Sequence, residues 1–250
     1  MVLCAGYGTR LGHLTQNMPK PMLRLKGIPV LEYIIRQLAV HGFDNIVINL
    51  HVSPEIFEEY FQSGSRFGVT LTYSYETELM GTAGGVKKAE RYFRAGGPFL
   101  IHYGDVLTEQ DFSEMLHFHR EKRALATLLL HWRRLSNSVI GLNSNGRITA
   151  FLERPTAAER QALLSPWVNS GICLVNGEFL DEIPAAMPCD LAKDIFPRLA
   201  SRKCLYGFPL RGFRCALDSP ERFAEAGKII SEKGSVMFKW LSRVEDTAGD

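Results

Sequence analysis

The sequence predicts an α/β fold with a mixed, mostly parallel central sheet and helices on both faces, a three-layer α/β/α arrangement. Two observations predict it. Strand-like apolar runs alternate with amphipathic helical stretches over the first half of the chain, which is typical of parallel strands joined by helices. The second half is richer in strand-like segments and carries the hairpin turn Ser144-Asn145-Gly146. The chain has 250 residues, 46% of them hydrophobic, so we expect one compact domain over 1–250.

The first half alternates regularly. Proline in the first turn and glycine just past the end favour a helix over 29–41, and Ser53 is the candidate N-cap of a second helix. Asp111 and Glu114 stand at capping-box spacing before another helix. The predicted strands are 46–50, 69–75 and 99–103, and the predicted helices are 29–41, 54–62, 81–93 and 111–122.

In the second half, Thr156 opens a short helix with Glu159 three residues later. The last helix begins at Ser219-Pro220-Glu221 and is expected over about 219–244. The segment 190–199 is also expected to be helical. The predicted strands are 124–131, 138–142, 147–152, 167–175, 205–209 and 213–217. No hexapeptide repeat occurs, so we expect no C-terminal left-handed β-helix in these residues.

Charge and cysteine usage narrow the functional class. The chain carries 29 basic and 27 acidic residues, a net charge of +2, which gives no reason to expect a nucleic-acid or membrane partner. The five cysteines are scattered and never spaced C-x-x-C, which indicates reduced thiols rather than disulfides or a zinc site. We expect no signal peptide before the first strand, and no apolar run approaches 18 residues. We expect a cytoplasmic protein, with a homo-oligomer left open.

A glycine loop near the start predicts phosphate binding. Gly6 and Gly8 carry no side chains, so backbone N–H groups can approach phosphate oxygens closely. Arg10 adds a positive charge, and Lys20 adds another from a stiff segment between two prolines. The loop lacks the G-K-[ST] end of a Walker A motif, and Leu11 stands where a dinucleotide fingerprint has its third glycine. A plain glycine turn with a chance arginine is the alternative.

The full run G-x-G-T-R-L, followed by P-K-P at 19–21, resembles the signature of sugar-1-phosphate nucleotidyltransferases, which make NDP-sugars. The resemblance implies a Rossmann-like fold and a Mg²⁺ cofactor. It assigns catalytic roles to Arg10, which stabilises pyrophosphate, and to Lys20, which holds the α-phosphate. We expect both side chains to be solvent-accessible without substrate. The implied nucleotide contacts are Leu3, Ala5, Gly6, Gly8, Thr9, Gly81 and Thr82.

Further segments extend the resemblance along the chain. Leu79-Met80-Gly81-Thr82-Ala83-Gly84 is similar to the family's L-G-T-A-G loop, which lies against the nucleotide base; a glycine-rich helix start is the alternative. Glu153-Arg154-Pro155 stands in the place of E-K-P, whose acid and lysine hold the sugar phosphate. Val168-Asn169-Ser170-Gly171-Ile172 matches V-N-x-G-I, whose asparagine binds sugar hydroxyls. Arg154 replaces a lysine and Asn137-Ser138 replaces the common Tyr-Gly, so we expect an altered sugar pocket.

The metal ligands are expected to be Asp105 and Asp218. Asp105 follows a strand in the family's G-D pattern, whose aspartate coordinates magnesium. Near the second ligand the chain departs from the family: Ala216 stands at the usual position in D-x-G-T-P-E-R. Asp218-Ser219-Pro220-Glu221 instead resembles the D-T-P-E-D of related cytidylyltransferases. The alternative for Asp218 is a polar residue beside the N-cap Ser219.

The resemblance predicts transfer of a nucleoside monophosphate from an NTP to a sugar 1-phosphate, with a preference for GTP and mannose 1-phosphate or manno-heptose 1-phosphate. The nucleotide-binding half is expected over about 1–122 and the sugar-binding half over about 123–218. Another NTP, or a non-sugar phosphate such as phosphocholine, remains an alternative. So does a catalytically weak paralogue that binds NDP-sugar and regulates a partner.

Overall fold

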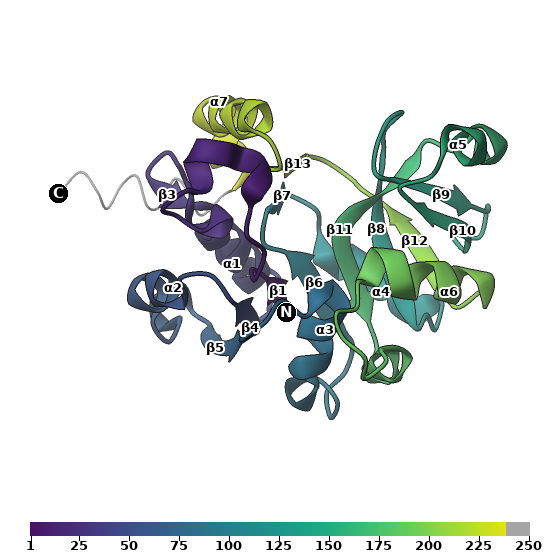
Figure 1. The fold of residues 1–250 in the computed structure, drawn as a ribbon, viewed down its shortest axis with the longest axis horizontal. Helices are drawn as coiled ribbons and strands as arrows, with labels where there is room; N and C mark the ends of the chain where they lie inside the picture. The colour runs from purple at the N-terminus through teal and green to yellow at the C-terminus, as the bar shows by residue number, and fades with distance from the viewer. Residues whose placement is uncertain (239–250) are drawn as a thin grey trace. The chain divides into compact units, whose positions relative to one another are not determined.

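The computed structural model describes residues 1–238, which form two compact units. The N-terminal unit comprises residues 2–77, 103–110 and the chain from 211 onward. The central unit comprises Met1 and residues 78–102 and 111–210. Figure 1 shows the elements of both. The expectation of a single domain with a nucleotide half and a sugar half stays a prediction.

The N-terminal unit is built on three parallel strands in the order β1-β4-β5, with Val2 opposite Ile48 and Ile48 opposite Tyr73. Helix α1 packs against β7, and α7 packs against β2 and β13. Two antiparallel pairs, β2–β3 and β7–β13, complete the unit. Its elements are β1 Val2–Leu3, β2 Arg24–Leu25, β3 Ile28–Pro29, α1 Val30–Val40, β4 Asn45–Leu50, α2 Pro54–Phe61, β5 Thr70–Tyr75, β7 Val106–Thr108, β13 Arg214–Ala216 and α7 Pro220–Met237.

Helix α1 is stabilised by burial of one apolar face. Leu31, Ile34 and Ile35 lie on this face and are almost completely removed from water. The Tyr33 hydroxyl donates to the carbonyl of Leu25, 3.0 Å away, which ties the helix to the β2–β3 hairpin. The segment preceding α1 is thereby fixed, and this segment carries Lys20.

The central unit contains the antiparallel part of the sheet. Its strands follow the order β10-β9-β11-β6, and β8 pairs with both β11 and β12. Only the β8–β12 pair is parallel among those described within this unit. Helix α6 packs against β10 and β12, and α4 packs against β8 and β11. The elements are α3 Gly81–Lys88, β6 Phe99–Tyr103, α4 Phe112–Glu121, β8 Ala126–Trp132, β9 Ser138–Leu142, β10 Ile148–Glu153, α5 Ala157–Leu163, β11 Trp167–Val175, α6 Phe196–Ser201 and β12 Leu205–Pro209.

The Rossmann-like α/β class with a mixed sheet and flanking helices is confirmed. The parallel character expected from strand–helix alternation belongs to β1, β4 and β5, where the alternation is regular. Among the described residues, no helix is both long enough and apolar enough to cross a membrane.

Several local predictions are confirmed, and others need correction. The short helix predicted to open at Thr156 is present, and the structure adds a capping box between Thr156 and Glu159. Asp111 caps α4 by accepting from the N–H groups of Ser113 and Glu114. Ser53, however, adopts a left-handed conformation and makes no capping bond at α2. The helix expected over 81–93 ends as α-helix at Lys88 and continues as a 3₁₀ turn at Glu90–Tyr92, while the one expected over 190–199 begins as a π-helix at Leu191–Ile195. The part of the last predicted helix beyond 238 lies outside the described residues.

Candidate active site

The glycine loop of the N-terminal unit has the tight geometry that its sequence predicts. Gly8 has φ +66°, and its carbonyl accepts from Leu11 N–H at 3.0 Å and from the Thr15 hydroxyl at 3.1 Å. A Cβ at Gly8 would lie 3.1 Å from the Lys20 Cβ and 3.3 Å from a Thr15 methyl. Glycine is therefore required both by the backbone conformation and by the close approach of the P-K-P segment.

A second close approach brings the Gly104-Asp105 pair to the end of β1. The Gly104 N–H donates to the Leu3 carbonyl at 2.9 Å. A Cβ at Gly104 would lie 2.6 Å from the Cys4 sulfur and 2.8 Å from the Leu3 oxygen. Because only glycine fits at position 104, the next residue, Asp105, lies close to the start of the glycine loop.

Lys20 forms an ion pair with Asp105. The lysine is only 8% exposed, which corrects the expectation that its side chain would be solvent-accessible. The reason is the 3₁₀ turn Lys20–Met22, whose three residues are all buried and which directs the side chain to the Asp105 carboxylate. Arg10 differs, because its side chain is 66% exposed as expected.

Backbone pairing brings the segment of Asp218 next to the segment of Asp105. Strands β7 and β13 pair Ala216 with Val106, and just beyond them Leu217 N–H donates to the Asp105 carbonyl at 2.8 Å. The Asp218 carboxylate lies 3.5 Å from an Arg10 guanidinium nitrogen and 2.5 Å from one of Arg222. The α7 N-cap is the Ser219 hydroxyl, which accepts from Arg222 N–H. Asp218 itself is thus engaged in ion pairs.

The donor set of these two aspartates fits magnesium. Mg²⁺ prefers hard oxygen ligands and is usually held by one or two carboxylates, with phosphates and water completing the shell. Within residues 1–238, no group of three or more His, Cys, Asp and Glu side chains is arranged to hold a metal ion. Two carboxylates would leave coordination positions for substrate phosphates and water.

The nearby thiols are chemically quiet. Burial, assisted by the negative charge of Asp105, raises the pKa of the Cys4 thiol well above its usual range. Burial also raises the pKa of Cys215, on β13, to about 11. Both groups stay protonated at neutral pH, so neither supplies a thiolate nucleophile.

In the central unit, the Gly81-Thr82 turn is locked to the segment before α6. Gly81 has φ +76°, and a Cβ there would lie 2.3 Å from the Cys189 carbonyl oxygen. The Thr82 hydroxyl donates to Asp190 and accepts from Leu191 N–H, each at 2.8 Å. Thr82 is therefore a structural tie within its own unit. Residues 81–84 form the first turn of α3, the glycine-rich helix start that was the alternative for this motif, and the N–H groups of Ala83 and Gly84 donate to the Cys189 carbonyl at 3.0 and 3.2 Å.

Glu153 lies near a second carboxylate that the sequence did not single out. Burial raises the pKa of Glu153, the negative charge of Asp190 raises it further, and Arg154 lowers it. Asp190 also caps the segment 191–195, because it accepts from the N–H groups of Ala192 and Lys193 at 2.9 and 3.0 Å. The sequence indicated that Asp190 precedes an apolar helical run, as an N-cap residue does. It did not indicate that Asp190 lies near Glu153.

The remaining predicted residues are held by unusual backbone. Arg154 is exposed and has φ +51°, a left-handed conformation that costs a non-glycine residue about 1–2 kcal/mol. Its N–H donates to the Asn137 carbonyl at 2.5 Å. Asn169 lies at a register shift of β11, where Gly171 has φ +81°. The buried Ser138 hydroxyl accepts from Asn169 N–H at 2.9 Å.

The structure thus brings Arg10, Lys20, Asp105 and Asp218 together in the N-terminal unit. Beside them Leu3 ends β1, Ala5, Gly6 and Gly8 form the glycine loop, and Thr9 begins the 3₁₀ helix Thr9–Thr15. In the central unit it links Thr82 and Glu153 through Asp190, and Ser138 supports Asn169. Arg222 and Asp190 are the charged neighbours that the sequence reasoning missed. The proximity of Asp190 to Glu153 is a tertiary contact that no local pattern shows, whereas Arg222 pairs with Asp218 four residues earlier, a spacing that could have indicated it.

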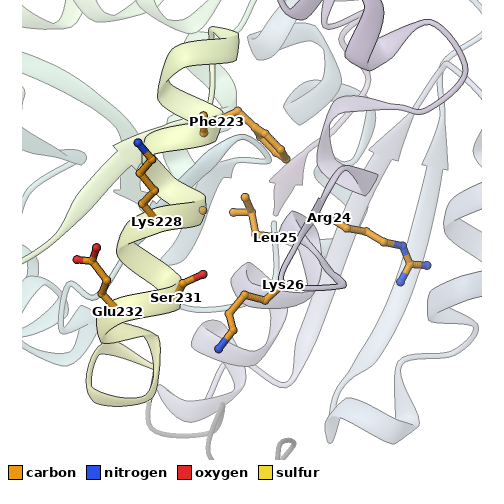
Figure 2. Close-up of a pocket in the computed structure, with 9 residues that line it drawn as sticks. Arg24, Leu25, Lys26, Phe223, Lys228, Ser231 and Glu232 are labelled. Carbon is orange, nitrogen blue, oxygen red and sulfur yellow. The ribbon is translucent and has the colours of Figure 1, made fainter.

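A groove of about 530 Å³ in the N-terminal unit is separate from these residues. It runs between the β2–β3 hairpin and α7, with Leu25 and Phe223 among its apolar lining residues. Figure 2 shows that the basic ends of Arg24, Lys26 and Lys228 point in different directions. They do not converge on a common anion, and none of the predicted site residues lines this groove.

Comparison with known proteins decides the family. The nucleotidyl transferase family model matches residues 1–240. The chain belongs to this family. It is 36% identical over 213 residues to a UTP–glucose-1-phosphate uridylyltransferase of Synechocystis, a match that covers 80% of the chain, and 31% identical over 228 residues to a mannose-1-phosphate guanyltransferase of Yarrowia lipolytica, which covers 89%. These matches span 54% and 61% of the two relatives' lengths.

The fold comparison agrees. The structure of a UDP-glucose pyrophosphorylase complexed with UDP-glucose superposes with a TM-score of 0.78 at 17% identity, covering 93% of this chain and 97% of that one. At this identity the likeness concerns the fold. It supports the Rossmann-like class of this member of the nucleotidyl transferase family.

Proposed function

We propose that this nucleotidyl transferase makes an NDP-sugar and pyrophosphate from an NTP and a sugar 1-phosphate. The observation that carries the proposal is the cluster of Arg10, Lys20, Asp105 and Asp218 beside the glycine loop. Two cationic side chains there could bind the phosphates of a nucleotide, and two carboxylates could bind its divalent metal ion. The names of both relatives state the same class of chemistry.

The reaction is an in-line displacement. An oxygen of the sugar phosphate attacks the α-phosphorus of the NTP, a new P–O bond forms, the bond from the α-phosphorus to the bridging oxygen breaks, and pyrophosphate leaves with the electron pair. Two like charges 4 Å apart repel by about 4 kcal/mol at an effective dielectric constant of 20. The role of the protein is therefore to place cations and oxygen ligands in advance, with no protein nucleophile.

Each charged residue of the N-terminal unit has a defined role in this scheme. The loop N–H groups and the Arg10 guanidinium bind the phosphates that leave, and Lys20 holds the α-phosphate. Asp105 and Asp218 would hold magnesium, which when bound would neutralise phosphate charge. Before substrate binds, the same carboxylates are partners of Lys20 and Arg10, so the cations are already oriented.

The acceptor is assigned to the central unit. Asn169 and Glu153 supply amide and carboxyl groups suited to sugar hydroxyls, and Arg154 supplies the positive charge for the attacking phosphate. We favour GTP with mannose 1-phosphate or manno-heptose 1-phosphate. The 36% identity to a glucose-1-phosphate uridylyltransferase makes UTP with glucose 1-phosphate the second candidate. The substrates and the five free cysteines favour a cytoplasmic location.

A substrate matrix tests the proposal. Pyrophosphate release is measured with magnesium for four NTPs against mannose, manno-heptose and glucose 1-phosphates and phosphocholine, with the product identified by mass spectrometry. We expect one sugar phosphate and one NTP to dominate, and Arg10→Ala to abolish most of the signal. Tight binding of an NDP-sugar without turnover of any pair would contradict the proposal and favour a regulatory paralogue.

A further inference from the structure

The residue between the two loop glycines, Tyr7, is exposed yet anchored. Its side chain is among the exposed large apolar groups, with 57% of the residue accessible. Its ring meets the His51 ring edge-on, with centroids 5.4 Å apart, and its hydroxyl lies 3.1 Å from His51 Nε2. An exposed tyrosine with both its ring and its hydroxyl engaged is held in a defined place.

His51 is itself fixed from behind. Its Nδ1 lies 2.8 Å from the backbone carbonyl of Glu76. A carbonyl can only accept, so Nδ1 carries the hydrogen and, in the neutral ring, Nε2 accepts from the Tyr7 hydroxyl. Glu76 is 5% exposed and accepts through its carboxylate from the Asn49 amide at 2.7 Å.

The chain of contacts returns to the start of the loop. The Asn49 side-chain oxygen accepts from Cys4 N–H at 2.9 Å, just after β1 ends. The far side of the loop is held by Thr15, whose hydroxyl donates to the Gly8 carbonyl. The loop therefore has supports on both sides, and the Tyr7–His51 contact supports its tip between two glycines.

This third support matters because glycines lose the most conformational freedom on ordering. A loop that must be ordered by its ligand binds that ligand less tightly than a preformed loop does. We propose that His51 is a positioning residue that fixes the phosphate loop through Tyr7, and that this contact sets affinity for the NTP rather than the rate of phosphoryl attack. The inference rests on the proposed function, since it deepens how the nucleotide is bound.

The test separates nucleotide affinity from turnover. Calorimetry gives the Kd of the favoured NTP, and steady-state kinetics give kcat and both KM values, for Tyr7→Phe and His51→Ala and for the double variant. Losing one partly exposed hydrogen bond should weaken NTP binding about three- to tenfold. The KM for the sugar phosphate should stay within about twofold, and the double variant should be no worse than the poorer single one.

Matched controls exclude general damage. Tyr75→Phe removes another exposed tyrosine hydroxyl of the same unit, one that donates to Glu58, and His41→Ala removes another half-buried histidine that contacts a backbone carbonyl. Both controls should bind NTP as the wild type does. His51→Gln keeps an amide that can bond a hydroxyl, so it should recover part of the lost affinity.

Two results would overturn the inference. One is wild-type NTP affinity in both Tyr7→Phe and His51→Ala; in that case, loss of binding in Tyr7→Leu would make the ring a direct nucleotide contact. The other is full additivity in the double variant, which would mean that the two residues act separately. If the wild type binds NTP but transfers nucleoside monophosphate to no acceptor, the proposed function is wrong. The NTP-binding measurements would still test the role of His51 and Tyr7.

Discussion

Carboxylates of the two units are placed in opposite electrostatic settings. In the N-terminal unit, Asp105 faces Lys20, and Asp218 faces two arginines. In the central unit, Glu153 lies near Asp190, and its pKa is raised by burial and by that neighbouring charge. The first arrangement suits exchange of partners with phosphates and a metal ion. The second suits hydrogen bonding to hydroxyls, where an uncompensated full charge is a disadvantage.

The largest effect that tests this contrast is expected from the cations. Arg10→Ala and Lys20→Ala should each lower kcat/KM by about 10²–10³-fold, because a preplaced electrostatic contact is removed. Arg10→Ala should leave the melting temperature nearly unchanged, since its side chain is exposed. Lys20→Ala should also destabilise the protein, because it leaves the carboxylate of Asp105 without this cation. Near-normal kcat/KM in either variant would remove that residue from the mechanism.

The next effect concerns metal dependence. Asp218→Asn keeps the size of the side chain and removes its charge, so it should raise the magnesium concentration needed for half-maximal activity by about tenfold, as loss of one ligand does. NTP binding should remain measurable by calorimetry. Asp44→Asn, at an exposed position of the same unit, is the control. An unchanged magnesium titration would show that Asp105 holds the ion without Asp218.

A smaller effect is expected on the KM values of the two substrates. Glu153→Gln and Asn169→Ala should raise the KM for the sugar phosphate several-fold more than the KM for NTP, because both residues are assigned to the acceptor. A lost hydrogen bond to a sugar hydroxyl corresponds to about three- to tenfold in affinity. Equal changes in both KM values would mean that the assignment of acceptor groups to the central unit is misplaced.

The smallest effect is a pH dependence of stability. The pKa of Glu153 is raised in the folded state, so the folded state binds more protons than the unfolded state as pH rises past the ordinary glutamate value. This group therefore lowers stability progressively as pH rises through its folded pKa. Glu153→Gln should unfold at higher urea concentration than wild type at pH 7, and the difference should shrink toward pH 4. A constant difference across this range would contradict the raised pKa.

Local patterns predicted what local forces decide. The Thr156–Glu159 capping box and the strand 167–175 follow from cap chemistry and apolar runs that need no distant partner. The glycine loop was also predictable, because the positive φ of Gly8 needs that residue type. These features account for the fold class and for the glycine loop of the candidate site.

Tertiary contacts decided the rest. Lys20 is buried against Asp105, which lies 85 residues later in the sequence. A local sequence pattern cannot indicate a contact between residues so far apart. Asp190 joins Thr82 across 108 residues for the same reason. Short elements such as the two-residue strands β2 and β3 carry too little periodicity to be recognised. The prediction of an N-cap at Ser53 was wrong, because the backbone of this residue is in the left-handed conformation and its side chain makes no capping hydrogen bond.

The pairing of β7 with β13 has a consequence for biosynthesis. Arg214 pairs with Thr108 and Ala216 with Val106, so the strand pair that orients Asp105 and Asp218 joins residues about a hundred positions apart. A growing polypeptide that has reached residue 210 already contains Lys20, Asp105 and the whole central unit, but not β13 or α7. Because domains fold as units during synthesis, the central unit can fold before β13 is made, and Asp105 and Asp218 come together only after the central unit has been synthesised.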